Sequence, residues 1–141
     1  MIIQPYLFFE GRCEEALEFY KSALGAEVTM LTRFKDNPEP QVASAEGCTA
    51  PTELENKVMH TAFRIGESNI MASDGRCSGQ TAHQGFSLSI TAENELEADR
   101  LFTNLADGGQ VQMPLAKTFF SPKFGIVADR FGVSWMVFVA P

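Results

Sequence analysis

The feature that most constrains this chain of 141 residues is an internal repeat with a period of about seventy residues. Each half reads as a strand, a helix and three strands. The apolar residues of the two predicted helices fall at matching offsets, namely Ala16, Phe19, Tyr20 and Ala23 in one and Ala98, Leu101, Phe102 and Leu105 in the other. We therefore predict an α+β fold of two βαβββ modules, residues 1–75 and 85–141, within a single domain.

The spacing of apolar residues sets the expected bounds of these elements. Helices are predicted over residues 12–24 and 91–107, the second with Thr91 as its N-cap. Strands are predicted over residues 3–9, 26–34, 57–65 and 69–74 in the first half, and over 86–91, 111–115, 119–128 and 133–139 in the second. A turn at 66–68 makes residues 57–74 a hairpin. Residues 35–56 have no period and predict a long loop, either a binding loop or a tolerated surface insertion.

Charge and length exclude several classes of protein. The chain has 11 basic against 18 acidic residues, a net charge of −7, and no cluster of lysine and arginine. An acidic domain repels phosphate backbones and anionic lipid, so we expect neither nucleic acid nor membrane as a partner. No apolar run approaches the length of a membrane span of about 20 residues. The N-terminal segment lacks the basic start and cleavage site of a signal peptide.

The three cysteines, Cys13, Cys48 and Cys77, are too far apart for a zinc knuckle or a redox dithiol. We interpret them as free thiols, which is compatible with a reducing cytoplasm. The expected location is therefore cytoplasmic.

Four motifs carry a resemblance to a known family: PYLFFEG at residues 5–11, EFYKSALGAEV at 18–28, RIGESNIMASD at 64–74 and FGIVADRFGVSWM at 124–136. Together with the duplicated element order, they resemble the PhnB-like group of the vicinal-oxygen-chelate superfamily, which includes glyoxalase I, bleomycin-resistance proteins and extradiol dioxygenases. The resemblance implies curved mixed sheets around a cavity, with helices outside. It also implies a homodimer, which fits the need to cover exposed edge strands.

Metal-using members of that superfamily take histidine, glutamine or glutamate ligands from the first and last strands of each module. In this chain Gln4 or Pro5, Met71, Gly85 and Met136 fall near those positions. A thioether is a weak ligand for Fe(II), Mn(II), Zn(II) or Mg(II). We therefore expect no metal and no other cofactor, with His83, His60 or Asp74 as the residues through which an unexpected metal would bind.

A cavity with acid–base groups is the expected site. We predict that His60 and Asp74 border one cavity as a catalytic pair, because they fall about opposite each other in the hairpin of residues 57–74. Met71, Ser73, Phe119, Met136 and Arg64 are its predicted lining. The plainer alternatives are a core histidine at residue 60 and an ordinary Asp-Gly turn at residue 74. One residue of register slip would separate the pair.

Three functions remain open from the sequence. The first is a small-molecule binding protein of the glyoxalase and bleomycin-resistance type with a degenerate metal site. The second is a cytoplasmic enzyme, acting as a lyase, isomerase or dioxygenase on a small oxygenated metabolite. The third is a structural or regulatory dimer. The PhnB-like group is often labelled a demethylubiquinone methyltransferase, but the chain has no glycine loop for S-adenosylmethionine and no doubly wound strand–helix alternation, so we do not expect methyl transfer.

Overall fold

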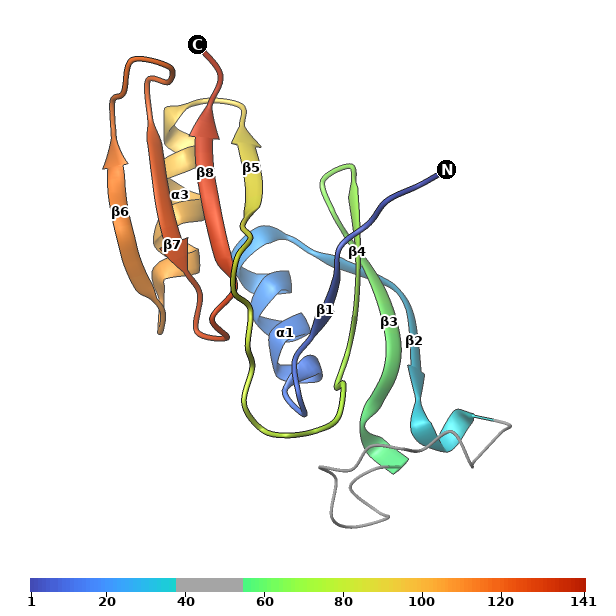
Figure 1. Cartoon of the computed structure of the whole chain (residues 1–141). Coiled ribbons are helices and arrows are strands. Elements are labelled where there is room, and N and C mark those ends of the chain that lie inside the picture. The colour runs from blue at the N-terminus through green and yellow to red at the C-terminus, as the bar shows by residue number, and fades with distance from the viewer. Residues whose placement is uncertain (38–54) are drawn as a thin grey trace. The chain divides into compact units, whose positions relative to one another are not determined.

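The computed structural model describes residues 1–37 and 55–141. The chain divides into two compact units, Met1–Thr81 and Ala82–Pro141. The expected modules, 1–75 and 85–141, lie within these units. In the described residues each unit has a four-stranded mixed sheet and an α-helix packed against it (Figure 1).

The first unit contains β1 (Tyr6–Phe8), α1 (Cys13–Leu24), β2 (Glu27–Arg33), a 3₁₀ turn η1 (Phe34–Asp36), β3 (Val58–Ile65) and β4 (Ser68–Ser73). Its strands lie in the order β1-β4-β3-β2. β1 pairs with β4 in parallel, and the other pairs are antiparallel. Gly25 ends α1 with φ 71°, the left-handed conformation that glycine adopts most readily. The predicted loop 35–56 lies largely outside the described residues.

The second unit contains β5 (Leu88–Ala92), α3 (Glu95–Ala106), β6 (Gln110–Ala116), β7 (Phe124–Ala128) and β8 (Ser134–Val139). Its strands lie in the order β5-β8-β7-β6, with β5 parallel to β8 and the other pairs antiparallel. This is the order of the first unit with each element replaced by its counterpart. The predicted α+β class and the βαβββ repeat are confirmed.

The repeat extends to the register of individual residues. Met71 on β4 lies between Tyr6 of β1 and Ala62 of β3. Its counterpart Met136 on β8 lies between Ser89 of β5 and Ile126 of β7. Each methionine therefore lies on a strand that is flanked by one parallel and one antiparallel neighbour.

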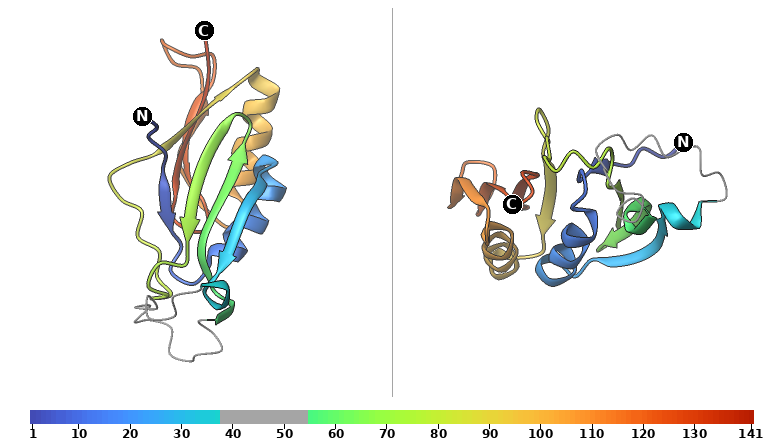
Figure 2. Two further views of the ribbon diagram at one scale, coloured as in Figure 1. Left: turned by 90° about the vertical axis from the view of Figure 1, so that its right-hand side faces the viewer. Right: turned by 90° about the horizontal axis from the view of Figure 1, so that it is seen from below.

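Each sheet buries one face against the helix of its own unit (Figure 2). In the first unit Tyr20 of α1 stacks on Phe63 of β3, with ring centroids 6.1 Å apart. In the second unit a Cβ on Gly125 would lie 2.8 Å from the ring of Phe102 of α3, so only glycine allows this close approach. Because strand side chains alternate, the residues between these buried positions point to the opposite face of each sheet. We call this the open face.

Two predicted boundaries in the second unit are wrong. The N-cap of α3 is Asn94, whose side chain accepts a hydrogen bond from the backbone N–H of Glu97 (2.8 Å), while Thr91 still belongs to β5. β7 begins at Phe124 instead of residue 119. The hydroxyl of Thr118 accepts hydrogen bonds from the N–H groups of Phe120 and Ser121, which turns the chain before the strand starts.

The prediction of free thiols is right for Cys13, which is free and buried, and wrong for Cys77, which is disulfide-bonded. Cys48 lies outside the described residues. Neither cysteine belongs to a group of three or more potential metal ligands within residues 1–37 and 55–141. Among the described helices, none has the length and apolar character needed to cross a membrane.

Candidate functional site

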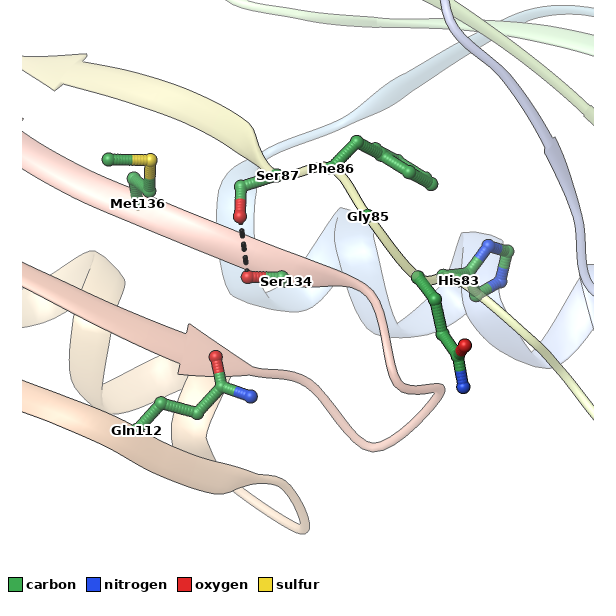
Figure 3. Close-up of a pocket in the computed structure, with 8 residues that line it drawn as sticks. His83, Gly85, Phe86, Ser87, Gln112, Ser134 and Met136 are labelled. Atoms are coloured by element: carbon green, nitrogen blue, oxygen red, sulfur yellow. Dashed lines mark hydrogen bonds between the residues drawn. The ribbon is translucent and has the colours of Figure 1, made fainter.

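A pocket of about 600 Å³ opens beside the sheet of the second unit. Its lining comes from the segment before β5 and from β6 and β8, and consists of His83, Gln84, Gly85, Phe86, Ser87, Gln112, Ser134 and Met136. Figure 3 shows Ser87 and Ser134 facing each other, with Met136 further along β8 and Gln112 on β6. Of the seven predicted site residues, Met136 lines this pocket.

The sheet register explains why these residues meet. Trp135 and Val137 are buried toward α3, so Ser134 and Met136 project from the open face. Ser89 pairs with Met136 in parallel strands. Two residues earlier in each segment, Ser87 therefore lies beside Ser134. The two hydroxyl oxygens are 2.7 Å apart and share a hydrogen bond.

Seven of the eight lining residues have no ionisable side chain, and the eighth is His83. Gln112 supplies an amide and the serine pair supplies hydroxyl donors and acceptors, while Met136 and Phe86 supply apolar surface. The rings of His83 and Phe86 meet edge to face, with centroids 6.3 Å apart. Polar side chains outnumber apolar ones in this lining, so hydrogen bonds contribute more to ligand recognition here than in the mostly apolar pocket that is usual for small molecules.

The open face of the first sheet presents a different group of side chains. The hydroxyl of Tyr6 on β1 and Nδ1 of His60 on β3 are hydrogen-bonded at 2.9 Å. The ring of Phe8 lies beside that of Tyr6, with centroids 5.1 Å apart. Because β4 lies between β1 and β3, the Tyr6 side chain reaches across it to His60.

Asp74 does not pair with His60, so this part of the prediction is wrong. Thr61 lies opposite Ala72, which places His60 beside Ser73 instead. The carboxylate of Asp74 accepts hydrogen bonds from the backbone N–H of Cys13 (2.8 Å) and of Val58 (2.6 Å). Asp74 is therefore on the helix side of the sheet, 1% exposed, and it joins the start of α1 to the start of β3.

The other predicted lining residues lie in separate surroundings. Met71 is half-buried on the open face of the first sheet, beside Tyr6. Ser73 is buried, and its hydroxyl accepts a hydrogen bond from the N–H of Gly75 (3.1 Å). Arg64 is exposed and forms an ion pair with Glu27. Phe119 is fully exposed in the connection between β6 and β7, because the strand begins only at Phe124.

Comparison with known proteins identifies the family of the chain. The profile of the family described as 3-demethylubiquinone-9 3-methyltransferase matches residues 2–138. The protein YjdN of Escherichia coli K12 is 37% identical over 138 residues, which are 97% of this chain and 94% of YjdN.

The chain belongs to this PhnB-like family.

Solved structures of family members share the whole fold. Protein PA1353 from Pseudomonas aeruginosa is 39% identical, with a TM-score of 0.82 over 99% of this chain and 98% of its own. A Bacillus cereus PhnB protein, described as a putative 3-demethylubiquinone-9 3-methyltransferase, is 32% identical, with a TM-score of 0.77 over 99% of this chain and 100% of its own. The fosfomycin resistance protein FosX of Listeria monocytogenes has the same fold, at 10% identity and a TM-score of 0.65 over 100% of this chain and 93% of its own.

The residues of this PhnB-like chain do not fit the metal that the superfamily fold implies. The side chains in register at the first and last strands of the two units are Tyr6 with Met71 and Ser89 with Met136. Thioether, phenol and hydroxyl groups make a weak donor set for a divalent first-row metal. The described residues also contain no group of three or more His, Cys, Asp or Glu able to hold one.

One family motif has a structural explanation. In ADRFGVSWM (128–136) the carboxylate of Asp129 accepts hydrogen bonds from the N–H groups of Phe131 (2.9 Å) and Val133 (3.1 Å) and from the indole of Trp135 (2.9 Å). Asp129 thus holds the turn that leads into β8 and so positions Ser134 and Met136.

Sequence reasoning missed Tyr6, Ser87, Gln112 and Ser134 as site residues. Alternation along residues 133–139 could have placed Ser134 on the face of Met136. Tyr6 and Ser87 could not be found this way, because the parallel pairs β1–β4 and β5–β8 join segments far apart in the sequence.

Proposed function

We propose that this PhnB-like protein binds a small, neutral, partly aromatic molecule in the pocket of the second unit and does so without a metal. The observation that carries the proposal is the pocket's lining, a hydrogen-bonded serine pair and an amide beside methionine and phenylalanine. Such a surface offers neutral donors and acceptors, while only His83 could carry charge. The donor set at the superfamily's ligand positions supports the absence of a metal.

A ligand with an aromatic ring and a carboxamide complements this pocket. The amide of Gln112 and the hydroxyls of Ser87 and Ser134 can each donate and accept, so they match a group that does the same. Phe86 is 45% exposed and offers a ring edge and face to a planar ligand.

The test is a binding titration with benzamide, monitored by calorimetry or by ligand-observed NMR. We expect Met136→Trp to abolish binding by filling the pocket. Met71→Trp is the matched control, because Met71 lies on the corresponding strand of the first sheet and outside this pocket. Equal binding by wild type and Met136→Trp, or no binding by wild type, contradicts the proposal.

An enzyme acting on a small oxygenated metabolite is the alternative. Its expected acid–base pair is not formed, since the Asp74 carboxylate is bonded to backbone N–H groups. Methyl transfer, the activity named in the family description, requires a site for S-adenosylmethionine, and we propose that this chain has none. Saturable binding of S-adenosylmethionine in equilibrium dialysis would contradict this.

We also propose that the chain forms a homodimer. The edge strand β6 exposes Val111 and Met113, and an exposed apolar edge favours pairing with another chain. Light scattering at micromolar concentration should then give about twice the chain mass of 15.5 kDa. A mass of one chain contradicts the proposal.

A cytoplasmic location is proposed on the composition of the chain, and the disulfide at Cys77 weighs against it, since disulfides persist mainly in oxidising compartments. Cell fractionation with markers for each compartment decides between these two observations.

A further inference from the structure

The open face of the first sheet carries a row of three rings. Tyr6 lies between the other two, with its ring centroid 5.1 Å from that of Phe8 and 5.5 Å from that of His60. The angles between ring planes are 37° and 33°, so the three rings are tilted rather than perpendicular. Phe8 is 52% exposed, and Tyr6 and His60 are half-buried.

The helix of this unit covers the other face of the sheet from this row of rings. α1 packs on the opposite face, where Tyr20 stacks on Phe63. Phe63 and Ile70 are paired and buried on that face, whereas Ala62 and Met71 are paired on the open face with Tyr6. The row therefore belongs to a surface that the core of the first unit leaves uncovered.

The polar groups of this row are joined by a hydrogen bond. The hydroxyl of Tyr6 and Nδ1 of His60 share this hydrogen bond, and the imidazole tautomer sets which of the two atoms donates. In either tautomer the Tyr6 hydroxyl can form a second hydrogen bond, as an acceptor where it donates to His60 and as a donor where it accepts from His60.

We infer that Tyr6, His60 and Phe8 form a second binding site, which takes a planar ring that carries a hydroxyl group, as in a phenol or an enol. The ligand ring stacks on the exposed ring surface around Phe8, because offset aromatic contacts are favourable. Its hydroxyl forms a hydrogen bond with the Tyr6 hydroxyl, which extends the chain of hydrogen bonds to His60. The three residues of this site all belong to the first unit, and the residues that line the pocket all belong to the second.

The hydroxyl requirement gives a sharp test with two matched probes, 4-cresol and p-xylene, which differ by a hydroxyl in place of a methyl group. Wild-type protein should bind 4-cresol more tightly than p-xylene by roughly three- to tenfold, the range expected for one net hydrogen bond. In Tyr6→Phe, which keeps the ring and removes the hydroxyl, this preference should disappear. Ser22→Ala, a hydroxyl deletion at an exposed position of α1, should keep it.

NMR of the imidazole groups shows where the probe binds, even if Tyr6→Phe fails to fold. The chain has two histidines, so the variant His83→Gln assigns the signals of His60. 4-Cresol should shift the His60 resonances of the wild-type protein. A preference that persists in Tyr6→Phe, or shifts confined to His83, overturns this site, and the second of these results leaves the proposed pocket of the second unit standing.

Discussion

The carboxylate of Asp74 accepts a hydrogen bond of 2.8 Å from the backbone N–H of Cys13, the first residue of α1. Its second oxygen accepts from the N–H of Val58 at 2.6 Å. A single buried side chain thus satisfies a donor at a helix start, where N–H groups have no partner within the helix, and a donor at a strand start. This role explains the aspartate that ends the motif RIGESNIMASD.

Asp74→Asn should lower the free energy of unfolding by about 1–3 kcal/mol, because an amide replaces one acceptor oxygen with an NH₂ group facing a buried donor. Urea unfolding measures this change. Glu67→Gln, a loss of charge at an exposed turn residue, is the control and should leave stability within about 0.5 kcal/mol. An unchanged unfolding midpoint for Asp74→Asn would rule out the structural role.

The sole tryptophan, Trp135, reports on the turn that leads into β8. Its indole N–H donates to Asp129 in a buried environment. In Asp129→Ala both this bond and the bonds to Phe131 and Val133 are lost, so we expect lower stability and a red-shifted tryptophan emission. Glu93→Gln, an exposed change in the same unit, should keep the wild-type spectrum. Identical spectra for wild type and Asp129→Ala would disprove the assignment.

The thiol of Cys13 should be inert in the folded protein. Burial raises its pKa well above the ordinary value of a thiol, and the charges of Asp74 and Glu14 raise it further. The thiolate is the reactive form, so alkylation by iodoacetamide should be slow in native protein and fast in urea. Mass spectrometry of the peptide that contains Cys13 measures both rates. Rapid labelling without urea would contradict the buried position.

The raised pKa of Cys13 also determines how this thiol changes the stability of the protein with pH. A thiol whose pKa is raised by folding stays protonated in the native state while the unfolded chain ionises. This group therefore lowers stability as the pH rises above the ordinary pKa of a thiol. The effect should be absent in Cys13→Ala, compared by urea unfolding across alkaline pH.

Glu14 and Arg33 join the first turn of α1 to the end of β2 through two hydrogen bonds, of 3.0 and 2.8 Å. The hydrogen bond from Arg33 lowers the pKa of Glu14. The stability it contributes is therefore present above the ordinary pKa of a glutamate and is lost as the pH falls through the lowered, folded-state value.

We accordingly expect Glu14→Gln to reduce stability at neutral pH by at most about 1 kcal/mol, since the Glu14 side chain is 58% exposed. The difference from wild type should vanish at low pH. Glu95→Gln changes a first-turn acid of α3 and controls for the helix dipole. Thermal unfolding at several pH values measures both, and a difference independent of pH would exclude the ion pair as its cause.

The sequence by itself determined the architecture. Apolar periodicity in two similar halves is enough to predict the βαβββ repeat, because helix and strand patterns depend on neighbours within a few residues. The same local pattern predicted the hairpin of β3 and β4. It failed at Thr91 and at residues 119–123, where a side-chain hydrogen bond a few residues away decides where an element starts.

The candidate sites were decided only by tertiary structure. His60 and Asp74 looked like a pair because a hairpin register can be counted only to within one residue, and one residue changes the face. The partner that His60 does have, Tyr6, is 54 residues away in sequence, and the serine pair of the second unit spans 47. Both contacts depend on parallel strands joined by long connections, so no local pattern encodes them, and only the folded sheets bring these side chains together.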